Sequence, residues 1–335
     1  MATKRRYWLS FVLFGIFFLG VFVLYWLYHN RLDHPQLEPT RYGITFSTEY
    51  AGQLGLDAAQ TYRSLIEDLG VRSVRLPVYW SSIEREKGSY DFALLDQLVA
   101  YSQAMNVKLT LVVGTKVPRW PECYVPDWAE VLGVNEQQRA AIDMITTVVT
   151  RYKDSSAVER WQVENEPFFP FGTCPTMTVA QFRERVEAVR KLDPARPIQV
   201  TVSGEIGPWS TETDEADILG VSMYRLTWND LFGYFMYPLS PEYYYVRAQL
   251  AQQRVSKVII SELQAEPWFP EPREKRTLAQ WYQSFDAQMF DNNLQFVKDT
   301  HLPEVYLWGA EWWALLKTHG DDRLWNVAKE VFGGA

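Results

Sequence analysis

Acidic and amide side chains recur in this sequence directly after short apolar runs that are rich in β-branched residues. Asn165 and Glu166 follow the fourth of these runs, and Glu262 follows the seventh. Two carboxyl groups in one site can divide the work of bond cleavage, because one holds a proton to donate while the other stays ionised. These positions therefore favour chemistry that is carried out by a pair of carboxylic acids.

Histidine and cysteine are scarce, with 4 His and 2 Cys in 335 residues. No His directly follows the apolar runs that carry polar residues, which argues against a Ser-His-Asp triad and against a His-ligated zinc ion. Two Cys are too few for a four-Cys zinc site. We therefore expect a site that uses no metal and no cofactor.

The charge balance excludes a further class of partner. The formal net charge is −8, and no block of Lys and Arg occurs in residues 41–335. Proteins that bind nucleic acid gather basic residues on one face. We therefore expect no nucleic-acid partner.

Eight apolar runs alternate with longer stretches whose apolar residues recur at helical spacing. This alternation predicts one α/β domain, a parallel (β/α)8 barrel of the TIM type. A doubly wound open sheet is the alternative, but no glycine-rich phosphate-binding turn follows the first run. The predicted strands are 42–46, 73–76, 108–114, 157–163, 198–203, 218–222, 257–260 and 305–308. The predicted helices include 57–69, 92–105, 136–152, 179–192, 241–253, 278–298 and 323–332.

The carboxyl ends of the strands form the catalytic face of such a barrel. With Asn165-Glu166-Pro167 after the fourth strand and Glu262 at the seventh, nearly all of the chain after residue 40 resembles clan A of the glycoside hydrolases. That clan contains retaining enzymes similar to cellulases, mannanases and β-galactosidases. The resemblance implies that Glu166 is the acid/base, that Glu262 is the nucleophile, and that an oligosaccharide or polysaccharide is the substrate.

Three more residues fit this resemblance. Arg75 at the second strand and Tyr224 after the sixth match side chains that keep the nucleophile ionised. Asn165 matches the amide that binds the sugar 2-hydroxyl, a contact that strengthens in the transition state. The sequence departs from the clan at Ser222, where many members carry a His, and this departure leaves the sugar open.

Tryptophan is abundant after the strands, and its flat apolar ring suits the C–H faces of a sugar. Trp308 on the eighth strand matches the sugar platform of the clan. A single Trp more often belongs to a core, so we expect only about two or three of the candidates to touch substrate. The candidates are Trp120, Trp228, Trp268, Trp308, Trp312 and Trp313.

Other acidic residues lie near the two preferred glutamates. We expect Glu164 and Glu266 to be exposed loop carboxylates, because the strand ends hold Glu166 and Glu262 more rigidly. Glu311 could contact substrate or pair with a nearby basic residue. Two further acids that follow strands are weaker candidates for substrate contact, Glu49 and Glu205.

The two cysteines follow neighbouring strands. Cys123 comes after the third strand and Cys174 after the fourth, so both lie on the same face of the predicted barrel. In an oxidising compartment we expect them to form a disulfide that braces the wall of the cleft. Two free thiols are the alternative.

The N-terminal segment predicts where the protein resides. Basic residues at 4–6 precede an uncharged, mainly apolar run over 7–28. About 20 apolar residues span the hydrocarbon core of a lipid bilayer, and flanking basic residues stay in the cytoplasm. We therefore expect an uncleaved transmembrane anchor (1–30), a spacer (31–40) and an extracytoplasmic catalytic domain (41–335). A cleaved signal peptide is the alternative.

The combined prediction is a membrane-anchored, retaining glycoside hydrolase that acts on a β-linked glycan. A transglycosidase with the same site is one alternative, because the aromatic segment 225–240 could form a lid that excludes water. A catalytically inactive barrel that only binds glycan is the other. The presence of both glutamates and of their supporting residues favours an active enzyme.

Overall fold

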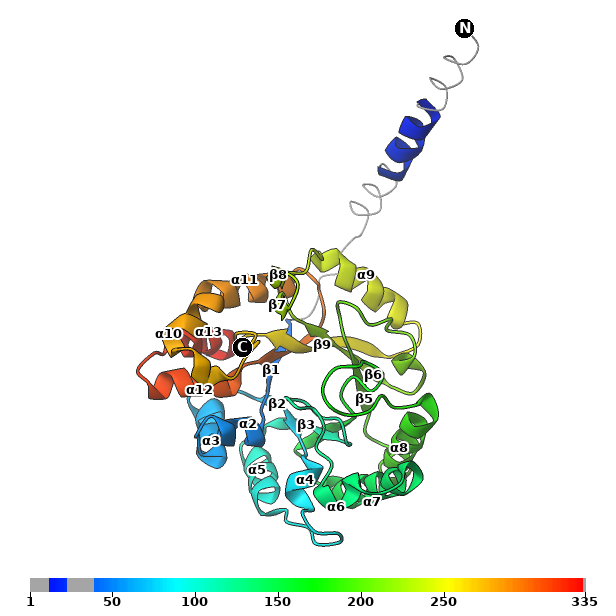
Figure 1. The fold of residues 1–335 in the computed structure, drawn as a ribbon, viewed down its shortest axis with the longest axis vertical. Coiled ribbons are helices and arrows are strands. Elements are labelled where there is room, and N and C mark those ends of the chain that lie inside the picture. The colour runs from blue at the N-terminus through cyan, green and yellow to red at the C-terminus, as the bar shows by residue number, and fades with distance from the viewer. Residues whose placement is uncertain (1–11, 23–38, 334–335) are drawn as a thin grey trace. The chain divides into compact units, whose positions relative to one another are not determined.

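The computed structural model describes residues 12–22 and 39–333. Eight parallel strands close into a barrel in the order β1-β10-β9-β6-β5-β4-β3-β2, and helices surround it (Figure 1). The predicted (β/α)8 barrel is confirmed. The strands are β1 (Arg41–Thr45), β2 (Ser73–Pro77), β3 (Lys108–Val113), β4 (Val158–Val163), β5 (Ile198–Val202), β6 (Ile218–Met223), β9 (Lys257–Gln264) and β10 (Glu304–Trp308).

The longer helices agree with the predicted ranges, with one exception. The helix predicted over 278–298 is wrong, because the chain is extended at Phe285 and Asp286 caps a new helix by accepting a hydrogen bond from the Met289 amide. The longer helices are α3 (Ala58–Glu67), α5 (Ala93–Ala104), α7 (Val134–Tyr152), α8 (Val179–Leu192), α9 (Pro241–Ala251), α11 (Ala287–Lys298) and α13 (Arg323–Gly333). The shorter ones are α2 (Thr48–Gln53), α4 (Trp80–Ile83), α6 (Asp127–Glu130), α10 (Leu278–Ser284), α12 (Ala310–Thr318), η1 (Glu212–Asp214) and η2 (Arg273–Lys275).

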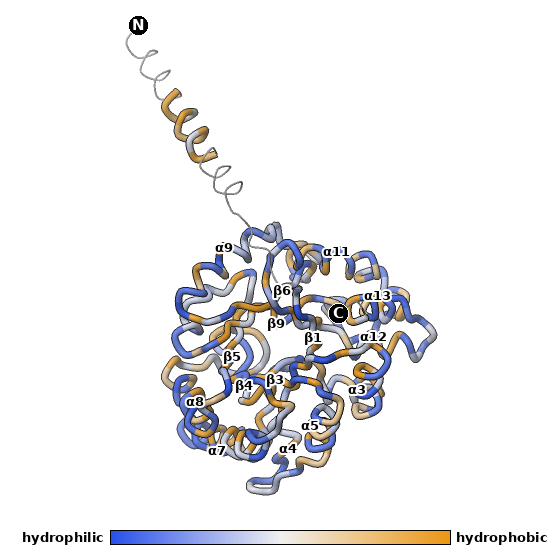
Figure 2. Tube along the Cα trace, turned by 180° about the vertical axis from the view of Figure 1, so that it is seen from behind, coloured by the Kyte–Doolittle hydropathy of each residue, from blue (hydrophilic) through white to orange (hydrophobic). Residues whose placement is uncertain are grey.

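The hydrophobic core fills the layer between the strands and the surrounding helices. In α7, the residues that recur every three or four positions are buried, among them Met144, Ile145, Val148 and Val149. This spacing places them on one stripe of the helix, which faces the sheet. Figure 2 shows apolar stretches on the strands and mixed apolar and polar stretches along the helices. The rigid ring that results holds the ends of the strands in fixed positions.

Strand β9 is longer than the sequence predicts. It continues to Gln264, so Glu262 lies within the strand and not after it. The pairing register shifts between Val221 and Ser222 of β6, and Glu262 is then the partner of Ser222. Irregular pairing of this kind re-aims side chains near the end of a strand. The carboxyl end of β9 is therefore shaped locally to present Glu262.

An additional two-stranded ribbon follows β6. Strands β7 (Leu226–Asn229) and β8 (Gly233–Met236) pair antiparallel within the aromatic segment 225–240. The Gln264 side chain fixes the start of the ribbon, because it accepts from the Leu226 amide at 2.9 Å and donates to the Leu226 carbonyl at 2.8 Å. The ring of Trp228 packs against that of Tyr234 on the opposite strand of the ribbon. This contact assigns Trp228 to the packing of the ribbon.

The N-terminal part of the chain forms a separate unit, Met1–Glu38, of which residues 12–22 are described. They form a helical segment that is apolar along most of its length (Figure 2). Half of the predicted anchor over 7–28 lies outside the described residues. No helix within 12–22 or 39–333 has both the length and the apolar character that crossing a membrane requires.

Candidate active site

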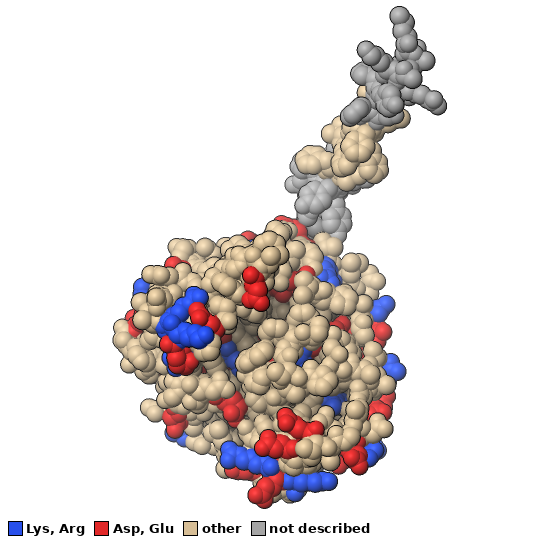
Figure 3. Space-filling view, in the orientation of Figure 1, with Lys and Arg blue, Asp and Glu red and all other residues tan. Residues whose placement is uncertain are grey.

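The residues of the candidate site come from three strands that are separated from one another around the barrel. Arg75 lies in β2, Glu166 follows β4 and Glu262 lies in β9. The face seen in Figure 3 is hollowed near the middle of the ring of helices, and uncharged residues border most of the hollow. The hydrogen bonds among the site residues show which side chains the barrel brings together.

The carboxylate of Glu262 is held by two donors. The Arg75 guanidinium donates to its Oε1 at 2.7 Å, and the Tyr224 hydroxyl donates to its Oε2 at 2.9 Å. A cation and hydrogen-bond donors stabilise the negative charge of a carboxylate. The structure therefore brings the two predicted supporting residues to the predicted nucleophile.

Arg75 also connects this carboxylate to β4, which lies beyond β3 in the barrel. Its side chain has no exposed surface, so its charge depends on partners inside the barrel. Its Nε donates to Gln162 Oε1 at 2.7 Å, and a terminal nitrogen donates to Asn165 Oδ1 at 2.6 Å. Asn165 thus lies in one hydrogen-bonded group with Arg75 and Glu262, and its contact with the sugar 2-hydroxyl stays a prediction.

Glu166 lies in a different electrostatic environment. Its Oε1 accepts from the Ser222 hydroxyl at 2.9 Å, and its backbone amide donates to Thr201 Oγ1 at 2.9 Å. Burial raises the pKa of Glu166 well above its ordinary value, and the charges of Glu262 and Glu122 add to the rise. A carboxyl group with a raised pKa stays protonated near neutral pH, as a general acid must. The two glutamates therefore have different partners, since Glu262 meets a guanidinium and a phenol hydroxyl, whereas Glu166 meets a serine hydroxyl and neighbouring carboxyl groups.

The backbone is strained around these side chains. Within the described ranges, seven non-glycine residues have positive φ, and four of them belong to the loops that follow β3 and β4. A residue held in this region of φ costs on the order of 1–3 kcal/mol, and such residues cluster at functional sites. The four are Arg119, Glu122, Glu164 and Glu166.

Glu164 is buried, and the expectation of an exposed loop carboxylate is wrong. Its Oε1 pairs with Arg185 at 2.5 Å, and its Oε2 accepts from the Lys116 amide at 2.7 Å. Gly114 (φ 147°) makes room for it, because a Cβ at that position would lie 2.2 Å from Glu164 Oε1. Glu164 therefore holds the turn after β3 and is not free for catalysis.

A second cluster of buried charges lies beside Trp308. Arg119 pairs with both Glu266 and Glu311, the latter at 2.6 Å. Its guanidinium carbon lies 4.1 Å from the ring centroid of Tyr50 and 4.2 Å from that of Trp308. Glu266 is thus buried, contrary to expectation, and Glu311 pairs with a basic residue, which was one of its two predicted roles. Because Arg119 covers one ring face of Trp308 and the residue is only 7% exposed, little of this ring is open to a sugar.

The remaining tryptophans divide into core and surface residues. Trp312 and Trp313 lie in α12 with no exposed surface, so they belong to the core. Trp268 is half-buried, and its ring meets that of Tyr224 edge to face at 5.5 Å between centroids. Trp120 is 63% exposed. The tryptophans best placed to meet a sugar are therefore Trp268, which packs beside the hydrogen-bond donor Tyr224, and the exposed Trp120.

Two acidic residues that were weaker candidates prove to have protein partners. Glu205 accepts from the Tyr224 amide at 2.7 Å and from the Tyr244 hydroxyl at 3.1 Å. Burial raises the pKa of Glu205 to about 7. Glu49 accepts from the Ser82 hydroxyl at 2.5 Å. Glu205 thus supports the chain at Tyr224.

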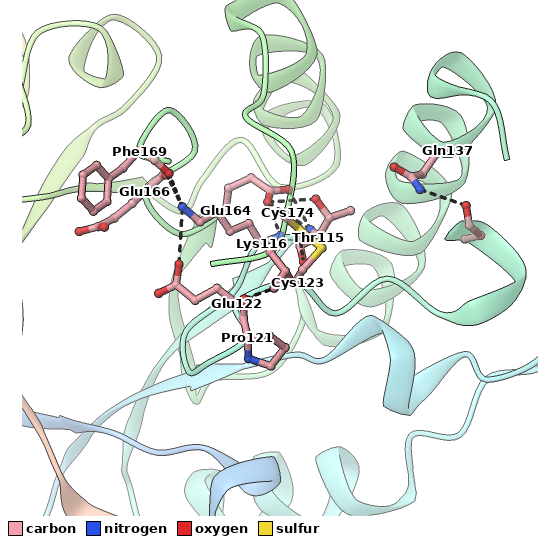
Figure 4. Close-up of a disulfide and its surroundings, with 12 residues drawn as sticks. Thr115, Lys116, Pro121, Glu122, Cys123, Gln137, Glu164, Glu166, Phe169 and Cys174 are labelled. Carbon is pink, nitrogen blue, oxygen red and sulfur yellow. Dashed lines mark hydrogen bonds and ion pairs between the residues drawn. A yellow bond between two sulfur atoms is a disulfide. The ribbon is translucent and has the colours of Figure 1, made fainter. Parts of the chain in front are cut away.

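Sequence reasoning missed one buried carboxyl group. Glu122 accepts a hydrogen bond from Asn165 Nδ2 at 3.2 Å, and its Oε2 lies 3.5 Å from Lys116 Nζ. Figure 4 shows Lys116 reaching between the side chains of Glu122 and Glu166. The available signal was a Glu after the third strand, on the same face as the other two glutamates. The loop conformation that turns it inward is not evident from spacing.

The predicted pairing of Cys123 with Cys174 is confirmed (Figure 4). The bridge joins the loop after β3 to the loop after β4 and closes 51 residues of chain. Glu122 is adjacent to Cys123, so the bridge also anchors the loop that carries this carboxyl group.

We expect that replacing both cysteines with serine will lower the free energy of unfolding by about 4 kcal/mol, because the chain entropy of the unfolded state rises. Urea unfolding of the oxidised protein and of the double variant measures the difference. Equal midpoints would show that the bridge adds nothing to stability.

We expect that Tyr224→Phe will lower kcat/KM about 10- to 100-fold, because a hydrogen bond to a charged group contributes about 1.5–3 kcal/mol. The ring and its contact with Trp268 are kept, so folding should be unaffected. Steady-state kinetics together with a thermal melt measure both effects. A variant as active as the wild type would remove Tyr224 from the site.

Comparison with known proteins agrees with this geometry. The family model described as cellulase (glycosyl hydrolase family 5) matches residues 39–226, which extends from before β1 to the start of the ribbon. A putative mannan endo-1,4-β-mannosidase 4 of Arabidopsis thaliana is 27% identical over 223 residues, 58% of this chain and 50% of the relative. The β-galactosidase BgaA of Clostridium cellulovorans is 28% identical over 120 residues, 30% of this chain and 18% of the relative. The chain thus spans half or less of the length of these relatives.

Solved structures share the fold at low identity. A β-galactosidase from Rahnella sp. R3 superposes with a TM-score of 0.60 at 12% identity, covering 89% of this chain and 56% of that one. A GH5_18 protein from Streptomyces cattleya, in complex with GlcNAc, gives 0.55 at 13%, covering 82% and 71%. Because the family model matches more than half of the residues, including those that bear Arg75, Asn165 and Glu166, the chain belongs to the cellulase family, glycosyl hydrolase family 5.

Proposed function

We propose that this protein is a retaining glycoside hydrolase that cleaves a β-linked glycan by double displacement. Glu262 attacks the anomeric carbon, and Glu166 first protonates the leaving oxygen and then deprotonates the incoming water. One observation carries the proposal. Arg75 and Tyr224 stabilise charge on Glu262, whereas burial and neighbouring carboxylates keep a proton on Glu166.

The substrate class follows from the chemistry of the site and from the names of similar proteins. Buried carboxyl and amide groups suit sugar hydroxyls, and Trp268 and Trp120 offer apolar ring faces. The similar proteins are named for action on β-galactosides and on β-1,4-mannan. We therefore propose a β-linked oligosaccharide or polysaccharide as substrate.

We further propose that residues 7–28 anchor the chain in a lipid bilayer, with the barrel on the extracytoplasmic side. The run is long enough to span the hydrocarbon core and is preceded by basic residues. A disulfide between Cys123 and Cys174 suits an oxidising compartment. Fractionation of cells that express the full chain, followed by carbonate extraction, tests the anchor. Recovery in the soluble fraction would contradict it.

A screen with aryl β-glycosides and β-linked oligosaccharides tests the proposed reaction. The full chain in detergent is incubated with each compound, and proton NMR follows the anomeric configuration of the first product. We expect a β-configured product, because two displacements restore the starting configuration. An α-configured product would contradict the nucleophilic role of Glu262.

A further inference from the structure

Lys116 and Glu122 form a buried pair within the candidate site. Both lie in the loop between β3 and α6, and each is at most 6% exposed. The loop forms a short hairpin, in which Lys116 bridges with Cys123 and the Glu122 amide donates to the Arg119 carbonyl. The disulfide then joins this hairpin to the loop after β4. The pair is therefore held firmly in place.

The contacts of the pair converge on the residues around the candidate acid. Lys116 Nζ donates to the carbonyl of Glu166 at 3.0 Å and to that of Phe169 at 2.7 Å. Glu122 Oε1 accepts from Asn165 at 3.2 Å, whereas its Oε2 accepts no hydrogen bond. Figure 4 shows the Lys116 ammonium between the carboxyl group of Glu122 and the chain at Glu166 and Phe169.

We propose that Lys116 and Glu122 are a pair of positioning residues, which fix Asn165 and the Glu166 peptide and balance the charge beside the candidate acid. The inference rests on the proposed role of Glu166. Neither residue is proposed to touch the reacting atoms. The Lys116 ammonium lowers the pKa of Glu166, and the Glu122 carboxylate raises it. The net effect of the pair on Glu166 therefore changes when Glu122 loses its proton.

The charged and polar groups around Glu166 come from three parts of the barrel. Glu262 on β9 and Glu122 raise its pKa, and Lys116 and the Ser222 hydroxyl on β6 lower it. Burial raises the pKa of Glu122 to about 8, against the opposing effect of Lys116. Glu122 therefore loses its proton in mildly alkaline solution. The new negative charge then helps Glu166 to retain its own proton as the pH rises.

Two substitutions with opposite expected effects test the pair. Glu122→Gln keeps an oxygen for Asn165 but cannot gain the negative charge that Glu122 acquires above a pH of about 8, so the pKa of Glu166 should fall by about one unit. Lys116→Met removes the positive charge, so the same pKa should rise by about one unit. Lys116→Arg keeps the positive charge, so the pKa of Glu166 in this variant should equal that of the wild type.

Carboxyl ¹³C NMR of the full chain, labelled at glutamate, measures these shifts, with Glu166→Gln to identify the signal. Because this readout requires no substrate, it decides the inference even if the screen for activity fails. The alkaline limb of kcat/KM on a cleaved glycoside should move in the same directions. Glu330→Gln, an exposed residue of α13, removes one charge elsewhere and should leave both readouts unchanged.

Opposite shifts would support the proposal, because a loosened site cannot move one pKa both ways. Shifts in the same direction, or no shift in either variant, would overturn it. Thermal melts of all variants show whether each is folded. If Lys116→Met does not fold, Lys116→Arg and Glu122→Gln still decide, since an unchanged pKa of Glu166 in Glu122→Gln is sufficient to overturn the proposal.

Discussion

Glu262→Ala is expected to lower turnover about 10⁴-fold or more, because it removes the group that forms the covalent bond to the sugar. The loss should be the same for all leaving groups, since no glycosyl-enzyme can form. The variant should stay folded, although Arg75 and Tyr224 each lose a partner. Kinetics on the best glycoside from the screen, with a thermal melt, measure both effects.

Glu266→Gln is the matched control for this variant. It lies four residues further along the chain and is equally buried, but its carboxylate is taken up by Arg119. We expect Glu266→Gln to retain far more activity than Glu262→Ala. An added anion such as azide should restore partial turnover to Glu262→Ala and give a product of inverted configuration. Full activity of Glu262→Ala, or a greater loss of activity in Glu266→Gln, would show that the nucleophile is a residue other than Glu262.

The barrel could be predicted from the sequence because its signals are local. A short β-branched run followed by a helical period recurs eight times, and each run proved to be a strand of the barrel. The same pattern predicted which residues lie at the ends of the strands. Arg75, Tyr224 and Glu262 meet because the closed ring fixes the distance between strands, which spacing alone cannot show.

The loops after β3 and β4 could not be predicted in the same way. Glu122, Glu164 and Arg119 adopt positive φ, and their neighbours along the chain give no indication of it. Each side chain then finds a partner far away in the sequence, as Glu164 does in Arg185. Glu164 and Glu266, which the sequence predicts to be exposed, are therefore buried in ion pairs.

These ion pairs explain why several glutamates share one face while few of them are free to react. A buried carboxylate without a partner is costly, so each one that is not catalytic needs a cation or several donors. Arg185 meets this need for Glu164, and Arg119 meets it for Glu266. Within residues 39–333, Ser222 provides the one side-chain hydroxyl or cation that donates to the carboxyl group of Glu166. We therefore expect Glu166 to avoid an unpaired negative charge by holding a proton, as its proposed role of general acid requires.

Glu166→Ala is expected to separate substrates by their leaving groups. Turnover of natural glycosides should fall about 10²–10⁴-fold, because the leaving oxygen needs a proton in the transition state. Formation of the glycosyl-enzyme from an activated aryl glycoside, such as a dinitrophenyl glycoside, should be nearly unchanged, since this leaving group departs without a proton. Hydrolysis of the glycosyl-enzyme then becomes rate-limiting, because the variant lacks the base that activates water. A rapid burst of phenolate is therefore expected before a slow steady rate.

The pH profile gives an independent test of the same role. In the wild type, activity on natural glycosides should fall as the pH rises through the pKa of Glu166, because the acid loses its proton. Burial and the charges of Glu262 and Glu122 raise this pKa, so the fall should come well above the pH at which an exposed Glu ionises. Glu166→Ala should lack this alkaline limb in the burst on the activated substrate. A limb that persists in the variant, or an equal loss on both kinds of substrate, would assign the proton to a different group.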